Sequence, residues 1–142
     1  MDRLRVLFLC TGNSARSQMA EALLRRRAGD RFEVYSAGLE PKDVHPMALA
    51  VLEEIGIDTR GHRSKGLDEF LGSVHFSYLI TVCSRAEERC PIFPGMGERI
   101  HWPLDDPAAF EGADAEKLAK FRQVRDEIDA RIAAWLSTLD AG

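Results

Sequence analysis

The stretch that decides the fold runs from Val6 to Ser17 and reads VLFLCTGNSARS. It opens with four apolar residues, a pattern typical of a strand buried on both faces of a parallel sheet. The next letters, TGNSA, are small or polar and indicate a turn. From Arg16 onward, apolar residues recur at helical spacing. The segment therefore predicts a strand, a loop and a helix, with Cys10 where the strand ends.

The alternation of apolar runs and helical patterns continues along the chain. Strands are predicted at Leu4 to Leu9, Phe32 to Ala37, Phe76 to Val82 and Glu98 to Trp102. Helices are predicted from Arg16, from Pro46 to Gly56, around Leu67 to Leu71 and from Asp114 to Leu139. Strands that alternate with helices form a parallel sheet with helices on both faces. We therefore expect one α/β domain over residues 1–142, built on a four-stranded parallel sheet.

The composition is that of an ordinary soluble protein. The chain has 142 residues, a net charge of −4 and a charged fraction of 30%, so it lacks the basic balance of a nucleic-acid binder. No apolar stretch approaches the roughly 20 residues that span a bilayer. The apolar run from Val6 to Leu9 is also too short for a signal peptide. We expect a cytoplasmic monomer with neither nucleic acid nor membrane as a partner.

Residues 10–17 combine a cysteine, five turn residues, an arginine and a serine. Successive backbone N–H groups in such a turn can hold a tetrahedral oxyanion, and the following helix adds its positive end. The guanidinium of Arg16 can grip two oxygens. The same donors favour the reactive thiolate of Cys10, to which Ser17 can donate a hydrogen bond. The residues expected to bind the oxyanion are Thr11, Gly12, Asn13, Ser14, Ala15 and Arg16, with the amide of Asn13 bracing the turn.

This pattern resembles the signature of the low-molecular-weight protein tyrosine phosphatases and of the arsenate reductases built on the same fold. The likeness extends over nearly the whole chain. It implies a flavodoxin-like strand order, Cys10 as the nucleophile and a general acid at an Asp-Pro dipeptide, which here is Asp106-Pro107. The neighbouring Asp105 leaves open which carboxyl group is the acid. Cys10, Cys83 and Asp106 all follow predicted strands, and ligands bind beyond the carboxyl ends of parallel strands.

Two further cysteines, Cys83 and Cys90, separate the two activities. A phosphatase needs one cysteine, because water hydrolyses its phosphocysteine, whereas arsenate reduction needs the two electrons of a dithiol. The segment CSRAEERCPI, residues 83–92, resembles the redox segment of thioredoxin-coupled arsenate reductases. The resemblance implies that Cys10 attacks arsenate, that Cys83 attacks Cys10 and releases arsenite, and that Cys90 then pairs with Cys83. An external thiol, expected to be thioredoxin, reopens that disulfide, and no tightly bound cofactor is implied.

Three other interpretations remain open at this point. The main alternative is a low-molecular-weight protein tyrosine phosphatase, although residues 38–46 contain no Phe, Tyr or Trp to line a phosphotyrosine site. Another is a non-enzymatic sensor that signals through a disulfide. The third, half of a zinc site made by Cys83 and Cys90 with His75 or His101, is disfavoured because their spacing fits no common zinc pattern. We therefore expect no metal.

The spacing of Cys83 and Cys90 also predicts a conformational change. If residues 83–90 were helical, their Cα atoms would lie about 10.5 Å apart along the helix axis. A disulfide requires Cα atoms roughly 4.4–6.8 Å apart. We therefore expect the segment from Cys83 to Pro94 to rearrange on oxidation, with Gly95 and Gly97 permitting the movement.

Some relatives of this fold carry a potassium ion beside the loop. The matching positions here are Asn13, Glu21 and Ser36, with a carboxylate near residue 65. This chain has Lys65 at that position, and its ammonium can stand beside Glu21 in place of the ion. We therefore expect little dependence on potassium. His45 and His62 fall in predicted loops, and we expect neither to be catalytic.

Overall fold

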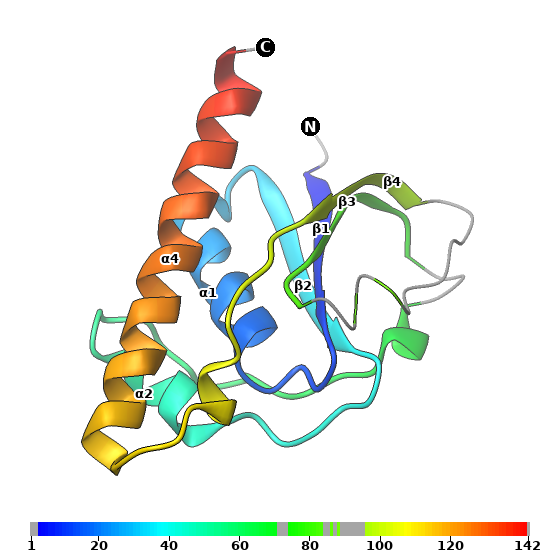
Figure 1. Cartoon of the computed structure of the whole chain (residues 1–142). Coiled ribbons are helices and arrows are strands. Elements are labelled where there is room, and N and C mark those ends of the chain that lie inside the picture. Colours follow the sequence, from blue (N-terminus) through cyan, green and yellow to red (C-terminus); the bar gives the residue numbers. More distant parts are fainter. Residues whose placement is uncertain (1–2, 71–73, 84–85, 87, 89–95, 142) are drawn as a thin grey trace.

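A four-stranded parallel sheet forms the centre of the computed structural model, which describes residues 3–70, 74–83, 86, 88 and 96–141 (Figure 1). The strands are β1 (Leu4–Cys10), β2 (Phe32–Gly38), β3 (Phe76–Thr81) and β4 (Met96–His101). They lie in the order β2-β1-β3-β4, with every neighbouring pair parallel. The predicted sheet and its flavodoxin-like order are therefore confirmed. The one clear shift is β4, which begins at Met96 because that residue pairs with Phe76.

The central position of β1 follows from its composition. Val6, Leu7, Phe8 and Leu9 are all fully buried. Side chains alternate between the two faces of a strand, so this run is apolar toward both layers that cover the sheet. Its last residue, Cys10, pairs with Gly38 at the end of β2. The nucleophile predicted from the sequence therefore stands at the carboxyl edge of the sheet.

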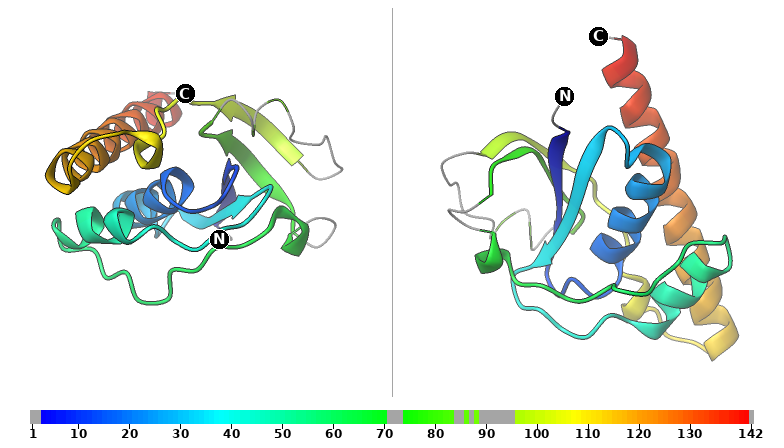
Figure 2. Two further views of the ribbon diagram at one scale, coloured as in Figure 1. Left: turned by 60° about the horizontal axis from the view of Figure 1, so that its bottom comes forward. Right: turned by 180° about the vertical axis from the view of Figure 1, so that it is seen from behind.

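Among the described residues, three α-helices gather on one side of the sheet (Figures 1 and 2). They are α1 (Arg16–Ala28), α2 (Pro46–Glu53) and α4 (Asp114–Ala141). Helix α2 contacts both α1 and α4, and it ends before the predicted Gly56, whose φ of 84° breaks the helix. No helix in the described part of the chain is both long and apolar enough to cross a membrane.

Aromatic side chains pack α4 and the segment after a short helix against the two faces of the sheet. Trp135 of α4 stacks on Phe32 and meets Tyr78 edge-on, with ring centroids 5.6 and 5.1 Å apart. On the opposite face, the short helix predicted around Leu67 is the 3-10 helix η1 (Leu67–Glu69). Phe70, directly after it, packs on Tyr35 of β2 with centroids 5.4 Å apart. These contacts exclude water from both faces of the sheet, where burial of apolar area stabilises the fold.

The segments that leave β3 and β4 stay beside the sheet for a short distance. Val82 N–H donates to Leu9 O at 2.9 Å, and Trp102 N–H donates to Thr81 O at 2.8 Å. These bonds continue the ladder past the ends of the strands. As a result, the chain at Cys83 and the loop after Trp102 lie at the same edge as the turn that follows β1.

Candidate active site

The turn between β1 and α1 is held from outside by the segment that follows β2. Four carbonyl groups of the turn accept backbone hydrogen bonds of 2.8–3.2 Å from residues 39–45. The donor and acceptor pairs are Leu39–Cys10, Glu40–Thr11, Lys42–Gly12 and His45–Ser14. In a planar trans peptide, a carbonyl and the next residue's N–H point in opposite directions. The N–H groups of residues 11, 12, 13 and 15 are therefore turned away from this segment, toward the inside of the turn.

Gly38 allows this close approach of β2 to the turn. A Cβ atom at Gly38 would stand 2.8 Å from both Asn13 N and Thr11 O. Contacts that short with backbone atoms would force the turn to move. The absence of a side chain at this position is thus part of how the turn keeps its shape.

Asn13 holds the interior of the turn. Its φ of 49° places it in the left-handed region, which asparagine tolerates better than most residues. Its Oδ1 accepts from Lys65 N at 2.8 Å and from Gln18 Nε2 at 3.0 Å. Its Nδ2 donates to Ser17 Oγ at 2.7 Å. The amide therefore ties the turn to α1 and to the segment before η1.

Cys10 is buried, and its sulfur lies within hydrogen-bond distance of two donors. Asn13 N–H donates to Sγ at 3.0 Å, and Ser17 Oγ lies 2.8 Å from the same sulfur. Because Ser17 Oγ already accepts a hydrogen from Asn13 Nδ2, its own hydrogen is available for the sulfur. Two hydrogen-bond donors are therefore directed at the Cys10 sulfur.

A cavity of about 510 Å3 opens over this turn. Its lining brings together residues from the turn, the segment after β2, the end of β3 and the loop after β4. They are Cys10, Thr11, Gly12, Ser14, Ala15, Arg16, Lys42, Cys83, Leu104, Asp106 and Ala108. Of the residues predicted to bind or react with an oxyanion, Asn13 and Ser17 stand behind the turn, where both are fully buried.

Cys83 shares the cavity with Cys10. It is 4% exposed, and its Sγ lies 3.3 Å from Thr11 Oγ1 and accepts from Ala86 N at 3.4 Å. Both Cys10 and Cys83 are free thiols. Cys90 lies outside the described residues, as does most of the segment from Cys83 to Pro94, so the predicted rearrangement stays a prediction.

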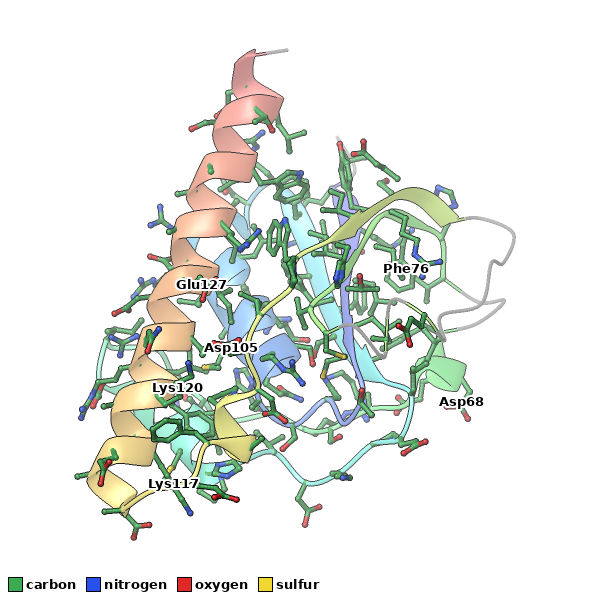
Figure 3. All side chains as sticks on the ribbon, in the orientation of Figure 1. Asp68, Phe76, Asp105, Lys117, Lys120 and Glu127 are labelled. Atoms are coloured by element: carbon green, nitrogen blue, oxygen red, sulfur yellow. The ribbon has the colours of Figure 1, made fainter. Side chains whose placement is uncertain are left out.

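Arg16 and Asp106 lie next to each other in the wall of the cavity. Arg16 NH1 donates to Leu104 O at 2.9 Å, and its NH2 is 3.8 Å from Asp106 Oδ2. The other oxygen, Oδ1, accepts from Ala108 N at 3.0 Å and caps η2 (Pro107–Ala109). Asp105 points elsewhere, because its Oδ2 pairs with Lys120 Nζ of α4 at 2.9 Å (Figure 3). Of the two neighbouring carboxyl groups, the one at Asp106 lines the cavity.

The comparisons with known proteins agree with this geometry. The family profile described as low molecular weight phosphotyrosine protein phosphatase matches residues 5–142. The chain belongs to this family. An arsenate reductase of Halalkalibacterium halodurans is 46% identical over 138 residues, which cover 97% of this chain and 99% of that protein. The resemblance inferred from residues 6–17 is thereby confirmed.

Two solved structures are similar to this chain. One is described as an arsenate reductase in the phosphate binding state. It is 32% identical, with a TM-score of 0.79 and coverage of 95% of this chain and 98% of that one. The other is a thioredoxin-dependent arsenate reductase of Corynebacterium glutamicum, also 32% identical, with a TM-score of 0.73. It covers 98% of this chain, which spans 63% of that protein.

Lys65 stands where the family resemblance placed a cation. Its Nζ is 3.7 Å from Glu21 Oε1 and donates to Arg63 O at 2.8 Å, while Ser36 Oγ donates to the same Glu21 oxygen at 3.1 Å. Burial lowers the pKa of Lys65, and the charge of Glu21 opposes that shift. The ammonium therefore lies beside the buried carboxylate, and the weak dependence on potassium stays a prediction.

The two loop histidines lie away from the cavity lining. His45 caps α2 by accepting from Met47 N at 3.1 Å. His62 Nδ1 lies 2.9 Å from Gln18 Oε1, and burial lowers the pKa of His62, which favours its neutral form. Since Gln18 Nε2 donates to the Asn13 backbone oxygen at 3.0 Å, Oε1 is the acceptor and His62 Nδ1 is the donor.

Sequence reasoning missed Gly38, Lys42 and Gln18. Gly38 and Lys42 reach the turn from the segment after β2, and no local pattern marks a residue that acts across a crossover. Gln18 reads as an ordinary residue of an amphipathic helix, although it is fully buried and bonded to Asn13. Gly38 and Lys42 reach the site only because β1 pairs with β2, and this pairing is a feature of the tertiary structure.

Replacing Gly38 by alanine tests whether the turn depends on its contact with β2. The added Cβ would push against Asn13 N and Thr11 O. We expect Gly38→Ala to weaken orthophosphate binding at least tenfold, measured by isothermal titration, and to lower the free energy of unfolding by about 1–3 kcal/mol. Gly56→Ala is the control. A side chain at its φ of 84° lowers the stability of the protein, but the added Cβ has no neighbour within 4 Å and does not touch the turn. Unchanged phosphate affinity in Gly38→Ala would contradict this account of the turn.

Proposed function

We propose that this chain is an arsenate reductase in which Cys10, Cys83 and Cys90 deliver two electrons to arsenate. The observation that carries the proposal is the second thiol in the cavity, because Cys83 lies buried and reduced beside the turn that holds Cys10. Hydrolysis of a phosphocysteine has no use for such a thiol. The similarity to proteins named arsenate reductase, at 46% identity over almost the full length, supports the same conclusion.

Arsenate binds in the turn through backbone N–H groups and Arg16. Helix α1 begins at Arg16, directly after the turn, so its unsatisfied N–H groups and the positive end of its dipole face the anion. The Arg16 guanidinium lines the same cavity and can bind two oxygens at once. These groups neutralise the anion that the thiolate of Cys10 must approach.

The first step joins Cys10 to arsenic. The thiolate attacks, an As–S bond forms, and one oxygen leaves as water after taking a proton. Asp106 supplies that proton, since it is the carboxyl group that lines the cavity and lies 3.8 Å from Arg16. Ser17 and Asn13 release their hydrogen bonds to the sulfur as its charge passes into the new bond. Arsenic remains in its pentavalent state.

The second step is the reduction. The Cys83 thiolate attacks Cys10 Sγ, an S–S bond forms, and the electron pair of the As–S bond stays on arsenic, which leaves as arsenite. Thr11 keeps Cys83 beside the turn through a contact of 3.3 Å between Oγ1 and Sγ. Two thiols have then become one disulfide, which accounts for the two electrons gained by arsenic.

The last steps restore the site. The Cys90 thiolate attacks Cys83, the Cys10 thiolate departs, and the disulfide passes to Cys83 and Cys90. An external dithiol then reduces it, and we assign this role to thioredoxin because a similar protein with a TM-score of 0.73 is named thioredoxin-dependent. Nothing in this cycle requires a bound cofactor. The chain acts as a single-domain cytoplasmic monomer in this proposal.

Turnover of arsenate is the direct test of this function. With thioredoxin, thioredoxin reductase and NADPH supplied, we expect the wild type to release many equivalents of arsenite. Cys10→Ser should release none, because the nucleophile is lost. If the wild type formed no arsenite but hydrolysed an aryl phosphate, the chain would be a phosphatase and the proposal would be wrong.

The paired carboxyl groups offer a matched test of the proton donor. Asp106→Asn removes the acid that lines the cavity, and we expect kcat for arsenite release to fall about 10²–10⁴-fold. Asp105→Asn alters an adjacent carboxylate that pairs with Lys120, and we expect kcat to stay within about twofold. If kcat fell more in Asp105→Asn than in Asp106→Asn, Asp105 and not Asp106 would be the proton donor.

A further inference from the structure

We propose that Lys42 selects the doubly charged form of the oxyanion and helps the site to distinguish substrate from product. This inference deepens the proposed function and rests on it. Lys42 belongs to the segment after β2, outside the turn itself, and it lines the cavity together with Arg16 and Asp106. It is also exposed to solvent.

The backbone places this side chain over the turn. Lys42 N–H donates to Gly12 O at 2.8 Å, which fixes where the side chain begins. Its Cγ and Cδ atoms lie 3.7 Å from the position of a Cβ built on Gly12. The methylene groups of Lys42 therefore pass over Gly12, and the side chain lines the cavity with its ammonium at the end of this apolar stem. Lys42 thus directs the Gly12 carbonyl outward through its N–H and adds a positive charge to the lining of the cavity through its side chain.

The charge of Lys42 is available to a ligand. Arg16 already donates to Leu104 O and lies next to Asp106. Among the described residues, no carboxylate lies within salt-bridge distance of the Lys42 ammonium. Among the described residues that line the cavity, Arg16 and Lys42 are the two basic side chains and Asp106 is the one carboxyl group. An incoming anion therefore meets an excess of positive charge.

The attraction depends on the charge of the ligand. Coulomb energy is proportional to the product of the charges, so a dianion gains about twice as much from Lys42 as a monoanion. Near neutral pH, arsenate and phosphate exchange between these two forms, whereas arsenite is an uncharged acid. Lys42 therefore favours the dianionic substrate over the monoanion and gives no comparable attraction to the product. This difference assists binding before the reaction and release after it.

The test measures oxyanion binding without turnover. Orthophosphate bound in the turn should protect Cys10 from alkylation by iodoacetamide, which is uncharged, and peptide mass spectrometry follows Cys10 separately from the other cysteines. Lys42→Met keeps the apolar stem and removes the charge. We expect the protection constant for phosphate to weaken about three- to tenfold in Lys42→Met. Lys42→Arg should stay within about twofold of the wild type.

Lys117→Met is the matched control, because Lys117 lies on α4 (Figure 3) and does not line the cavity. We expect wild-type protection in this variant. The defect of Lys42→Met should shrink in high salt, which screens an exposed charge, and below the pH at which phosphate loses its second proton. With arsenate as substrate, KM should rise by the same factor while kcat changes less than twofold.

The possible outcomes separate the two proposals. Equal protection in the wild type and Lys42→Met would overturn the role of Lys42 while leaving the oxyanion site intact. The role of Lys42 would also be overturned if Lys42→Arg lost as much phosphate protection as Lys42→Met, or if the loss did not depend on salt or pH. In either case the side chain would act through its shape and not through its charge. If phosphate protected Cys10 in no form of the protein, the oxyanion site itself, and with it the proposed function, would be wrong.

Discussion

The arrangement of the site depends on the hydrogen bonds that draw the carbonyl groups of residues 10, 11, 12 and 14 outward to the segment after β2. In a trans peptide, the carbonyl and the N–H of the next residue point in opposite directions. Each carbonyl that is hydrogen-bonded to the segment after β2 therefore directs the following N–H toward the inside of the turn. This constraint requires β1 and β2 to lie side by side with Gly38 at the closest approach. The inward direction of these N–H groups is thus a consequence of the parallel pairing of two strands, and α1 adds its positive end behind the turn.

The same packing connects the turn to the chemistry of sulfur. Asn13, held in the left-handed conformation by Lys65 N–H and Gln18, donates to Cys10 Sγ through its backbone and to Ser17 through its side chain. Cys83 reaches the turn from the end of the neighbouring strand β3. The carboxyl edge of a parallel sheet therefore brings together a turn with inward N–H groups, the Cys10 thiol and a second thiol, which is the combination that the proposed reduction of an oxyanion needs.

The sequence predicts those parts of the site that are local, and the tertiary structure decides the others. The strand, turn and helix around Cys10 follow from the pattern of residues 6–17, and the parallel sheet follows from its apolar strands. The local sequence could not show which of Asp105 and Asp106 lines the cavity, because Asp105 pairs with Lys120 of α4. Lys42 likewise carried no signal in the sequence, since its position over Gly12 arises only when β2 pairs with β1.

The central claim is that Cys83 reduces arsenic by attacking Cys10. It is tested most directly by incubating Cys90→Ser with one equivalent of arsenate, without any reductant, and mapping the disulfides of the alkylated protein by mass spectrometry. Loss of Cys90 stops the relay after its second step, so the account predicts a disulfide between Cys10 and Cys83 and one equivalent of arsenite. Free, fully alkylated Cys10 and Cys83 together with unchanged arsenate would contradict it.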